Sequence, residues 1–174
     1  MPWLATRKPV QDAGDFLTRV DNSCSTRAAV NEHLFNAMSP MHHRDPGMVG
    51  AALAHAAYAE IIPDLLHVHP GAIRAALRAI PRLYVVTDST SAAGMPDGEY
   101  HLGSQRVTKC LGGVRLAGGT LAGSTLTMDQ ALRNLVSIGL PIADVSARLS
   151  RHAADYLGLV DRVASSGAHG PIWW

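Results

Sequence analysis

Two stretches of the chain repeat apolar residues at the spacing of an amphipathic helix. Residues 47–59 carry one wide apolar face, which predicts a helix. Residues 70–81 place isoleucine and leucine on one side and arginine on the other, and Pro81 is expected to end this second helix. Residues 60–62 predict a short buried strand. Residues 83–87 begin with four apolar residues in a row, as expected for a strand covered on both faces.

The glycine-rich segment from residue 89 to residue 124 has a different pattern. Three short strand-like pieces lie at residues 100–102, 106–108 and 114–116, and glycines separate them. We interpret this segment as a β-hairpin excursion that leaves the alternating strands and helices.

Helical patterns return after this excursion. Thr127 with Gln130 matches a capping box and predicts the start of a helix, which Gly139 is expected to end. Pro141 is expected to begin another helix that runs to about residue 157. Its inward-facing residues are expected to be Ile142, Val145 and Leu149.

Strands and helices therefore alternate through the middle of the chain, after a short strand at residues 28–30 that leads to His33. This order predicts an α/β fold with a parallel sheet and right-handed crossovers. We leave residues 1–30 unassigned, and residues 161–174 show no element pattern and are expected to form an irregular tail.

Composition narrows the class of protein. The chain has 174 residues, about one domain, of which 47% are hydrophobic and 17% charged. Its net charge of +1 argues against a nucleic-acid partner. Cys24 and Cys110 are far apart and lack zinc-site spacing, which is typical of free thiols in a reducing compartment. We found neither a signal peptide nor an apolar run of membrane-spanning length, so a soluble cytoplasmic protein is expected.

Polar side chains concentrate in residues 33–50, where three histidines, an asparagine and an arginine lie within twelve positions. His33 follows a predicted strand, and Pro46-Gly47 precedes the next helix. Barrel enzymes keep their chemistry in loops of this kind, between the end of a strand and the following helix. A loop of solvated histidines is the alternative, but the order and spacing of the whole stretch favour a site.

Several motifs in order resemble the N-acetylglucosamine-6-phosphate deacetylase family, which belongs to the metal-dependent amidohydrolase superfamily. The motifs are HLFNAM at 33–38, RDPG at 44–47, HVHP at 67–70, VTD at 86–88, MPDGEY at 95–100 and GTLAGSTLTM at 119–128. The second motif departs from the family pattern only at Asp45, where the family has Glu. The resemblance runs from about residue 33 to residue 159.

This resemblance implies a fold as well as a chemistry. The family has an eight-stranded β/α barrel, so residues 31–160 would form a partial TIM-type barrel of about the last three βα units, with C-terminal helices. A whole barrel needs about 250 residues, which 174 residues cannot supply.

The matched motifs also imply roles for individual residues. Asp88 matches the catalytic aspartate, which takes a proton from the attacking water and later passes it to the leaving amine. His33 matches a metal ligand, and Arg44 matches the arginine that pairs with the sugar phosphate. Asn36 and Ala37 match contacts to the same phosphate, and His67 matches a histidine that contacts the sugar near the acetamide. Leu121, Ala122 and Gly123 match a loop that lines the substrate. Leu65 stands where the family has a glycine, which often marks a positive φ.

The implied cofactor is a divalent metal ion such as zinc or iron, but the implied site is incomplete. A catalytic metal usually needs three protein ligands, and no residue upstream of His33 matches the family's Glu and first His. Glu32 is a poor substitute because strand neighbours point to opposite faces.

Three functional interpretations stay open on the sequence. The chain is a deacetylase that hydrolyses the acetamide of N-acetylglucosamine-6-phosphate, an inactive fragment of one, or half of a split enzyme. The implied ligand is an amino-sugar phosphate, and family members tend to form homo-oligomers. A short parallel sheet also leaves edge strands open, so we expect self-association.

Overall fold

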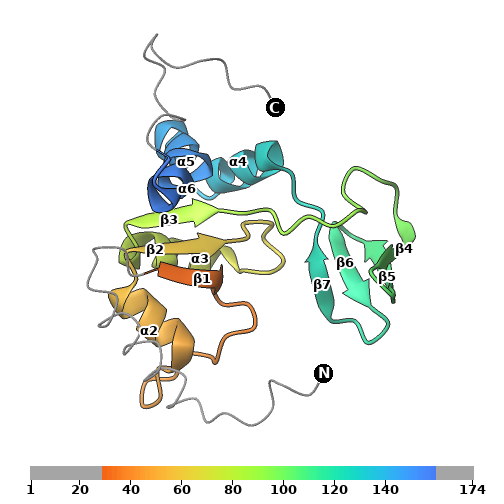
Figure 1. Cartoon of the computed structure of the whole chain (residues 1–174), viewed down its shortest axis with the longest axis horizontal. Coiled ribbons are helices and arrows are strands. Elements are labelled where there is room, and N and C mark those ends of the chain that lie inside the picture. Colours follow the sequence, from red (N-terminus) through yellow and green to blue (C-terminus); the bar gives the residue numbers. More distant parts are fainter. Residues whose placement is uncertain (1–28, 160–174) are drawn as a thin grey trace.

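The computed structural model describes residues 29–159, which form a parallel sheet with helices and a separate antiparallel sheet (Figure 1). The predictions for residues 1–28 and for the tail at 161–174 lie outside the described residues. Between residues 29 and 159 no helix combines the length and the apolar character that crossing a membrane requires.

The parallel sheet has three strands in the order β1 (Ala29–His33), β2 (Tyr58–Ile61) and β3 (Arg82–Val85). Helix α2 (Gly47–His55) connects the first pair and helix α3 (Pro70–Ala79) the second, so the predicted alternation is confirmed. The second strand begins two residues earlier than predicted.

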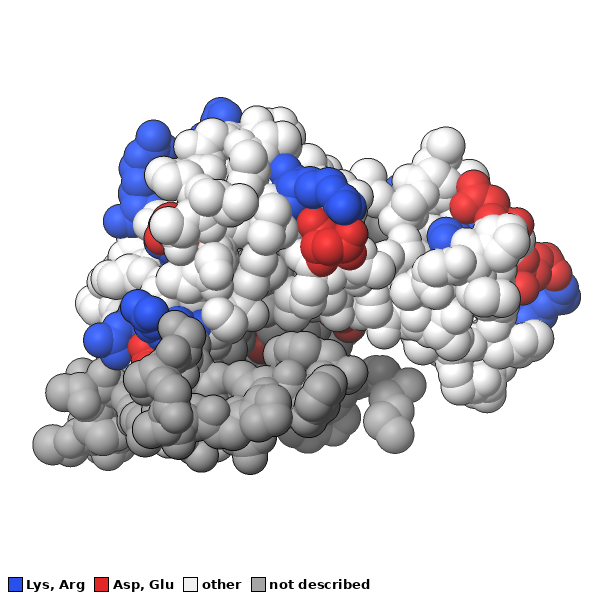
Figure 2. All heavy atoms as spheres, turned by 90° about the horizontal axis from the view of Figure 1, so that it is seen from above, with Lys and Arg blue, Asp and Glu red and all other residues white. Residues whose placement is uncertain are grey.

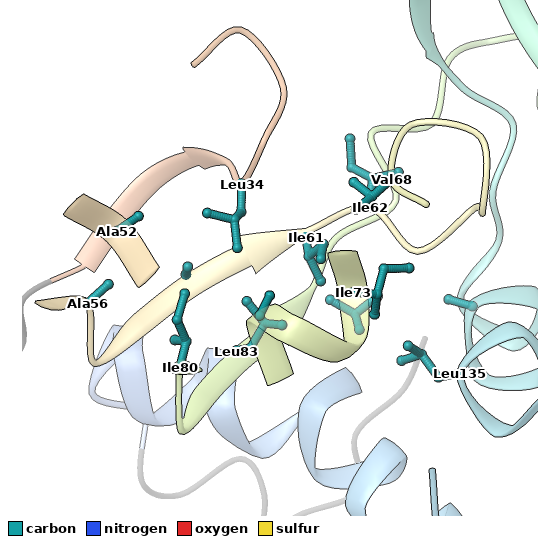
Figure 3. Close-up of a cluster of buried hydrophobic side chains, with 14 of the residues drawn as sticks. Leu34, Ala52, Ala56, Ile61, Ile62, Val68, Ile73, Ile80, Leu83 and Leu135 are labelled. Carbon is teal, nitrogen blue, oxygen red and sulfur yellow. The ribbon is translucent and has the colours of Figure 1, made fainter. Parts of the chain in front are cut away.

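The two faces of the parallel sheet differ in chemistry because side chains alternate along each strand. Ile61 and Leu83 are buried in the hydrophobic core beside helix α3 (Figure 3). Glu60 and Tyr84 are register partners on β2 and β3, one position along from those core residues. Tyr84 also stacks on Tyr156, with ring centroids 5.7 Å apart. One face is therefore apolar, and the other carries a carboxylate next to aromatic rings.

The excursion after residue 88 is larger than the predicted hairpin. It forms a four-stranded antiparallel meander, whose strands are β4 (Gly98–Leu102), β5 (Gln105–Cys110), β6 (Gly113–Leu116) and β7 (Leu121–Ser124). Leu121, Ala122 and Gly123, which we expected in a loop, belong to β7. That prediction was wrong because β7 pairs with β6.

Backbone hydrogen bonds join β7 to the segment that follows β3. The N–H of Ser124 donates to the carbonyl of Asp88 at 2.9 Å, and the N–H of Thr90 donates to the carbonyl of Ser124 at 3.0 Å. This short parallel pairing connects the two sheets at Asp88.

Three helices, α4 (Met128–Ser137), α5 (Ile142–Leu149) and α6 (Arg151–Leu157), complete the described chain. The predicted capping box is wrong, because the Thr127 hydroxyl donates to Asp129 and Gln130 donates to Asn134. The single predicted helix divides at Ser150, and Ile142 is 65% exposed rather than inward.

The face shown in Figure 2 mixes acidic and basic residues in small groups and has no large area of one sign. Two of the ion pairs are exposed: Glu99 with Arg106 on the antiparallel sheet, and Asp129 with Arg133 on α4. Exposed pairs of this kind contribute little to stability.

Side chains from α5 and α6 cover the outer edge of β3. The Arg148 guanidinium donates to the carbonyl of Leu83 at 3.1 Å, and Nδ1 of His152 lies 3.2 Å from the same oxygen. Arg148 is only 8% exposed and also donates to Asp144 at 3.1 Å. The edge of β3 is thus less open than the sequence suggested.

We expect Arg148→Ala to lower the free energy of unfolding by about 1–3 kcal/mol, because it leaves a buried carbonyl and the Asp144 carboxylate with fewer partners. It should also increase self-association, since it uncovers a strand edge. Urea denaturation and light scattering measure the two effects. The matched control is Arg151→Ala, which removes an exposed arginine of α6. Equal behaviour of both variants would contradict the protective role of Arg148.

Candidate functional site

Asp88 lies just beyond the C-terminal end of β3 and has an uncommon backbone conformation. Its φ of +48° is in the left-handed region, which most residues with a side chain avoid. The hydrogen bond from Ser124 holds its carbonyl, and its side chain is 38% exposed. Gly123 lies so near that an added Cβ would be 3.4 Å from the Asp88 carbonyl oxygen. Non-glycine residues in such conformations cluster at functional sites.

His33 ends β1 and turns toward Asp88 across the same edge of the sheet. Its Nε2 lies 3.7 Å from Oδ1 of Asp88, and its ring is 37% exposed. Its Nδ1 lies 2.9 Å from Oε1 of Glu60, although the alignment is not that of a hydrogen bond. The structure therefore brings together two residues that the sequence predicted and a third, Glu60, that it did not.

Glu60 was missed because it lies inside a short apolar strand that we interpreted as core. Its side chain is only 17% exposed. A carboxylate within an otherwise apolar strand was the one signal that indicated it, since buried carboxylates usually have a partner.

His67 and Asp64 form a second, more enclosed pair in the loop after β2. Nδ1 of His67 lies 2.6 Å from Oδ2 of Asp64, and the two side chains are 7% and 5% exposed. Leu65, which stands between them where the family has a glycine, has φ +67°, a backbone conformation that glycine adopts more readily. Burial acts to raise the pKa of the Asp64 carboxyl, but hydrogen bonds from His67 and the Leu66 N–H outweigh it and lower the pKa.

We expect Asp64→Asn to lower the free energy of unfolding by about 1–3 kcal/mol at pH 7, because the charged hydrogen bonds are lost. The folded-state pKa lies below the ordinary value, so the carboxylate stabilises the fold above about pH 4 and this contribution falls as the pH drops further. The stability difference from the unsubstituted chain should therefore shrink below about pH 4. Urea titrations across this range measure it, with the exposed Asp97→Asn as control. A pH-independent difference would show that charge is not the cause.

The loop after β1 carries the residues that we associated with phosphate. Ala37 has φ +56°, and the buried Nδ2 of Asn36 has no hydrogen-bond partner. Arg44 is exposed, and its backbone N–H lies 3.3 Å from Nδ1 of His42. Asn36 thus has an unused donor, and Arg44 is accessible to a ligand.

The described residues do not fit a metal ion on their own. Nowhere in residues 29–159 do three or more His, Cys, Asp or Glu side chains form a group that could hold one. His33 offers one imidazole, and Glu60 faces its Nδ1 rather than a shared position. We therefore assign no step of the chemistry to a metal held by these residues.

Comparison with known proteins places the chain in a family. The chain is 43% identical over 139 residues to N-acetylglucosamine-6-phosphate deacetylase of Lysinibacillus sphaericus, a match that covers 78% of this chain and 36% of that protein. It is 46% identical over 137 residues to a putative N-acetylgalactosamine-6-phosphate deacetylase of Escherichia coli K12, covering 77% of this chain and 81% of that relative. No protein-family model matches the chain.

Solved structures agree with the sequence comparison. N-acetylglucosamine-6-phosphate deacetylase of Thermotoga maritima superposes with a TM-score of 0.77 at 33% identity, covering 86% of this chain and 41% of that one. A substituted form of the Mycobacterium smegmatis deacetylase, in complex with N-acetyl-D-glucosamine-6-phosphate, superposes with a TM-score of 0.72 at 32% identity.

The chain is thus an α/β protein whose fold matches that of solved sugar-phosphate deacetylases. The chain belongs to the N-acetylglucosamine-6-phosphate deacetylase family. It spans little more than a third of the length of most relatives described as such, and most of the length of the Escherichia coli K12 relative.

Proposed function

We propose that this chain supplies the proton-accepting and substrate-binding part of an amino-sugar 6-phosphate deacetylase, and that residues 29–159 hydrolyse substrate only when a further polypeptide segment supplies the missing metal ligands. The main observation is the left-handed Asp88, held by β7 with its carboxylate 3.7 Å from His33. An exposed carboxylate beside an imidazole at one sheet edge suits a proton carrier.

Asp88 is the general base and then the general acid. Its carboxylate accepts a proton from the water that attacks the acetamide carbon. The C–N bond then breaks, and the same proton passes to the leaving nitrogen. The products are acetate and the free amino sugar phosphate, and Asp88 returns to its starting state.

The remaining predicted residues bind the substrate in this proposal. The exposed Arg44 takes the phosphate, for which a guanidinium offers two parallel hydrogen bonds, and Asn36 donates its unpaired amide. Ala37 completes the phosphate loop. His67 contacts the sugar, and Leu121, Ala122 and Gly123 line the acetamide side next to Asp88.

A metal ion would polarise the acetamide and lower the pKa of the attacking water. The family is metal-dependent, and we propose that His33 contributes one ligand while the others come from the further polypeptide segment outside residues 29–159. The three parallel strands would then be part of a closed TIM-type barrel. Such an assembly would work in the cytoplasm and would repeat as a homo-oligomer.

The substrate class is an N-acetylated hexosamine 6-phosphate rather than one named sugar. Relatives at similar identity are described as deacetylases of the glucosamine and of the galactosamine compound. These sugars share the phosphate and acetamide that Arg44 and Asp88 would contact, so both should be assayed.

The proposal is tested by measuring acetate release from both sugar phosphates with zinc or ferrous iron. We expect no release by the isolated chain, because its described residues do not complete a metal site. Release should appear when the part of the Lysinibacillus enzyme that this chain does not match is added. Calorimetric titration should show binding of N-acetylglucosamine-6-phosphate but not of unphosphorylated N-acetylglucosamine.

Two outcomes would overturn the proposal. Acetate release by the chain alone would show that it needs no second polypeptide. An inactive mixture, together with a chain that binds neither sugar phosphate, would indicate that the fold has lost the function of its relatives.

A further inference from the structure

Helix α4 contacts the loop that carries His67 through two side chains that the proposed mechanism does not use. Nδ2 of Asn134 donates a hydrogen bond of 2.9 Å to the carbonyl of Pro63, a residue 71 positions earlier in the chain. Nε2 of Gln130 donates to Oδ1 of the same asparagine at 2.8 Å. This second bond occupies the acceptor of the Asn134 amide and leaves its donor facing the loop.

The peptide group that Asn134 holds is the one that joins Pro63 to Asp64. Because this group is planar, fixing its carbonyl also fixes the direction in which the chain continues into Asp64. Oδ1 of Asp64 accepts from the N–H of Leu66 at 2.9 Å and from the N–H of His67 at 2.8 Å. Its Oδ2 lies 2.6 Å from Nδ1 of His67. The place of the His67 ring therefore follows from the peptide group that Asn134 holds.

Packing alone does not fix this loop against α4. Val68 and Leu135 belong to the same hydrophobic core, which brings the end of the loop and the helix together (Figure 3). Between the loop and α4, however, there is a hollow of about 280 Å³, whose lining includes Leu66 and Gln130. Side chains that border empty space have no partner atoms on that side. The hydrogen bond of Asn134 thus has a larger part in setting where the loop lies.

We propose that Asn134 is a positioning residue that places His67 for contact with the sugar, and that Gln130 orients its amide. In this role Asn134 does not touch the substrate and acts only through the loop. The inference rests on the proposed function, in which His67 contacts the sugar, and it extends that site to α4. Loss of the Asn134 donor should weaken binding of the sugar, whereas the phosphate, which Arg44 takes, should be bound as before.

Nuclear magnetic resonance of the full chain tests whether Asn134 holds the loop. Asn134→Asp keeps the shape of the side chain but turns an acceptor toward the Pro63 carbonyl in place of the donor. We expect hydrogen exchange of the Leu66 and His67 N–H groups to quicken about three- to tenfold, which corresponds to the loss of one hydrogen bond. The ring signals of His67 should shift in the same variant.

Arg74→Ala is the matched control, because it removes a hydrogen-bonded side chain at the other end of α4. The Arg74 guanidinium donates to the carbonyl of Ile138 at 2.9 and 3.1 Å. Its loss should lower the free energy of unfolding in urea but leave exchange of the two loop N–H groups unchanged. Gln130→Ala keeps the Asn134 donor and should quicken their exchange less than Asn134→Asp does. This milder variant decides the question if Asn134→Asp does not fold.

Titration with two probes shows whether the effect reaches the sugar. N-acetylglucosamine-6-phosphate should bind about three- to tenfold more weakly to Asn134→Asp than to the unsubstituted chain. Inorganic phosphate should bind equally to both, since it would contact Arg44 and Asn36 but not His67. Arg74→Ala should bind both probes as the unsubstituted chain does.

Unchanged exchange of the loop N–H groups in folded Asn134→Asp, or equal changes in this variant and in Arg74→Ala, would overturn the inference. So would an equal loss of affinity for the two probes, because the loop of His67 would then not be the cause. An unsubstituted chain that binds neither probe would overturn the proposed function, whereas the exchange rates would still support or overturn the role of Asn134 in the loop.

Discussion

Replacing Asp88 with asparagine should lower acetate release in the two-polypeptide mixture by about 10²–10⁴-fold, because the amide cannot accept the proton of the attacking water. Asparagine is one of the few residues that tolerate the left-handed backbone of this position, where φ is +48°. The variant should therefore keep the hydrogen bond from Ser124 and the local fold. A loss of acetate release in this variant would therefore reflect the missing proton acceptor rather than misfolding.

Binding separates this effect from a loss of the site. Asp88→Asn should bind N-acetylglucosamine-6-phosphate about as tightly as the unsubstituted chain, since Arg44 and Asn36 are unchanged. The control Asp97→Asn alters an exposed aspartate in the loop before β4 and should leave turnover as it was. If Asp88→Asn keeps full activity, Asp88 is not the proton carrier. If the variant no longer binds the sugar phosphate, Asp88 maintains the structure of the site instead.

Local sequence signals predicted the parallel strands and their helices because each is set by nearby residues. Pro46, Pro70 and Pro81 mark helix boundaries at or near those of α2 and α3. Patterns of this kind depend on backbone geometry within a few residues.

Features that depend on distant contacts could not be predicted in this way. Strand β7 looked like a loop because leucine, alanine, glycine and serine carry no strand signal, and its pairing with β6 and Asp88 decides its conformation. Ile142 fits a helical pattern but is exposed in the described structure. The contact between Glu60 and His33 depends on the pairing of β1 with β2, so residues near Glu60 in the sequence do not predict it.

The pairing of β7 with Asp88 makes Gly123→Ala the second substitution with a large expected effect. Gly123 has φ +120°, which residues with a Cβ rarely adopt, and a Cβ there would lie 2.7 Å from the Thr90 methyl carbon. We expect the free energy of unfolding to fall by about 1–3 kcal/mol from backbone strain. Urea denaturation measures this loss.

Acetate release should fall further than stability alone explains. Either β7 or Thr90, whose N–H donates to the Ser124 carbonyl, must shift to relieve this contact, and the Ser124 N–H holds the Asp88 carbonyl at 2.9 Å. A shift of about 1 Å at a reacting group can cost about 10²-fold in rate. Gly118→Ala is the matched control, because a Cβ there meets no atom within 4 Å and its φ is not positive. If both variants lose equal activity, glycine content rather than the contact with Asp88 is responsible. If Gly123→Ala is destabilised but fully active while folded, the position of Asp88 does not depend on β7.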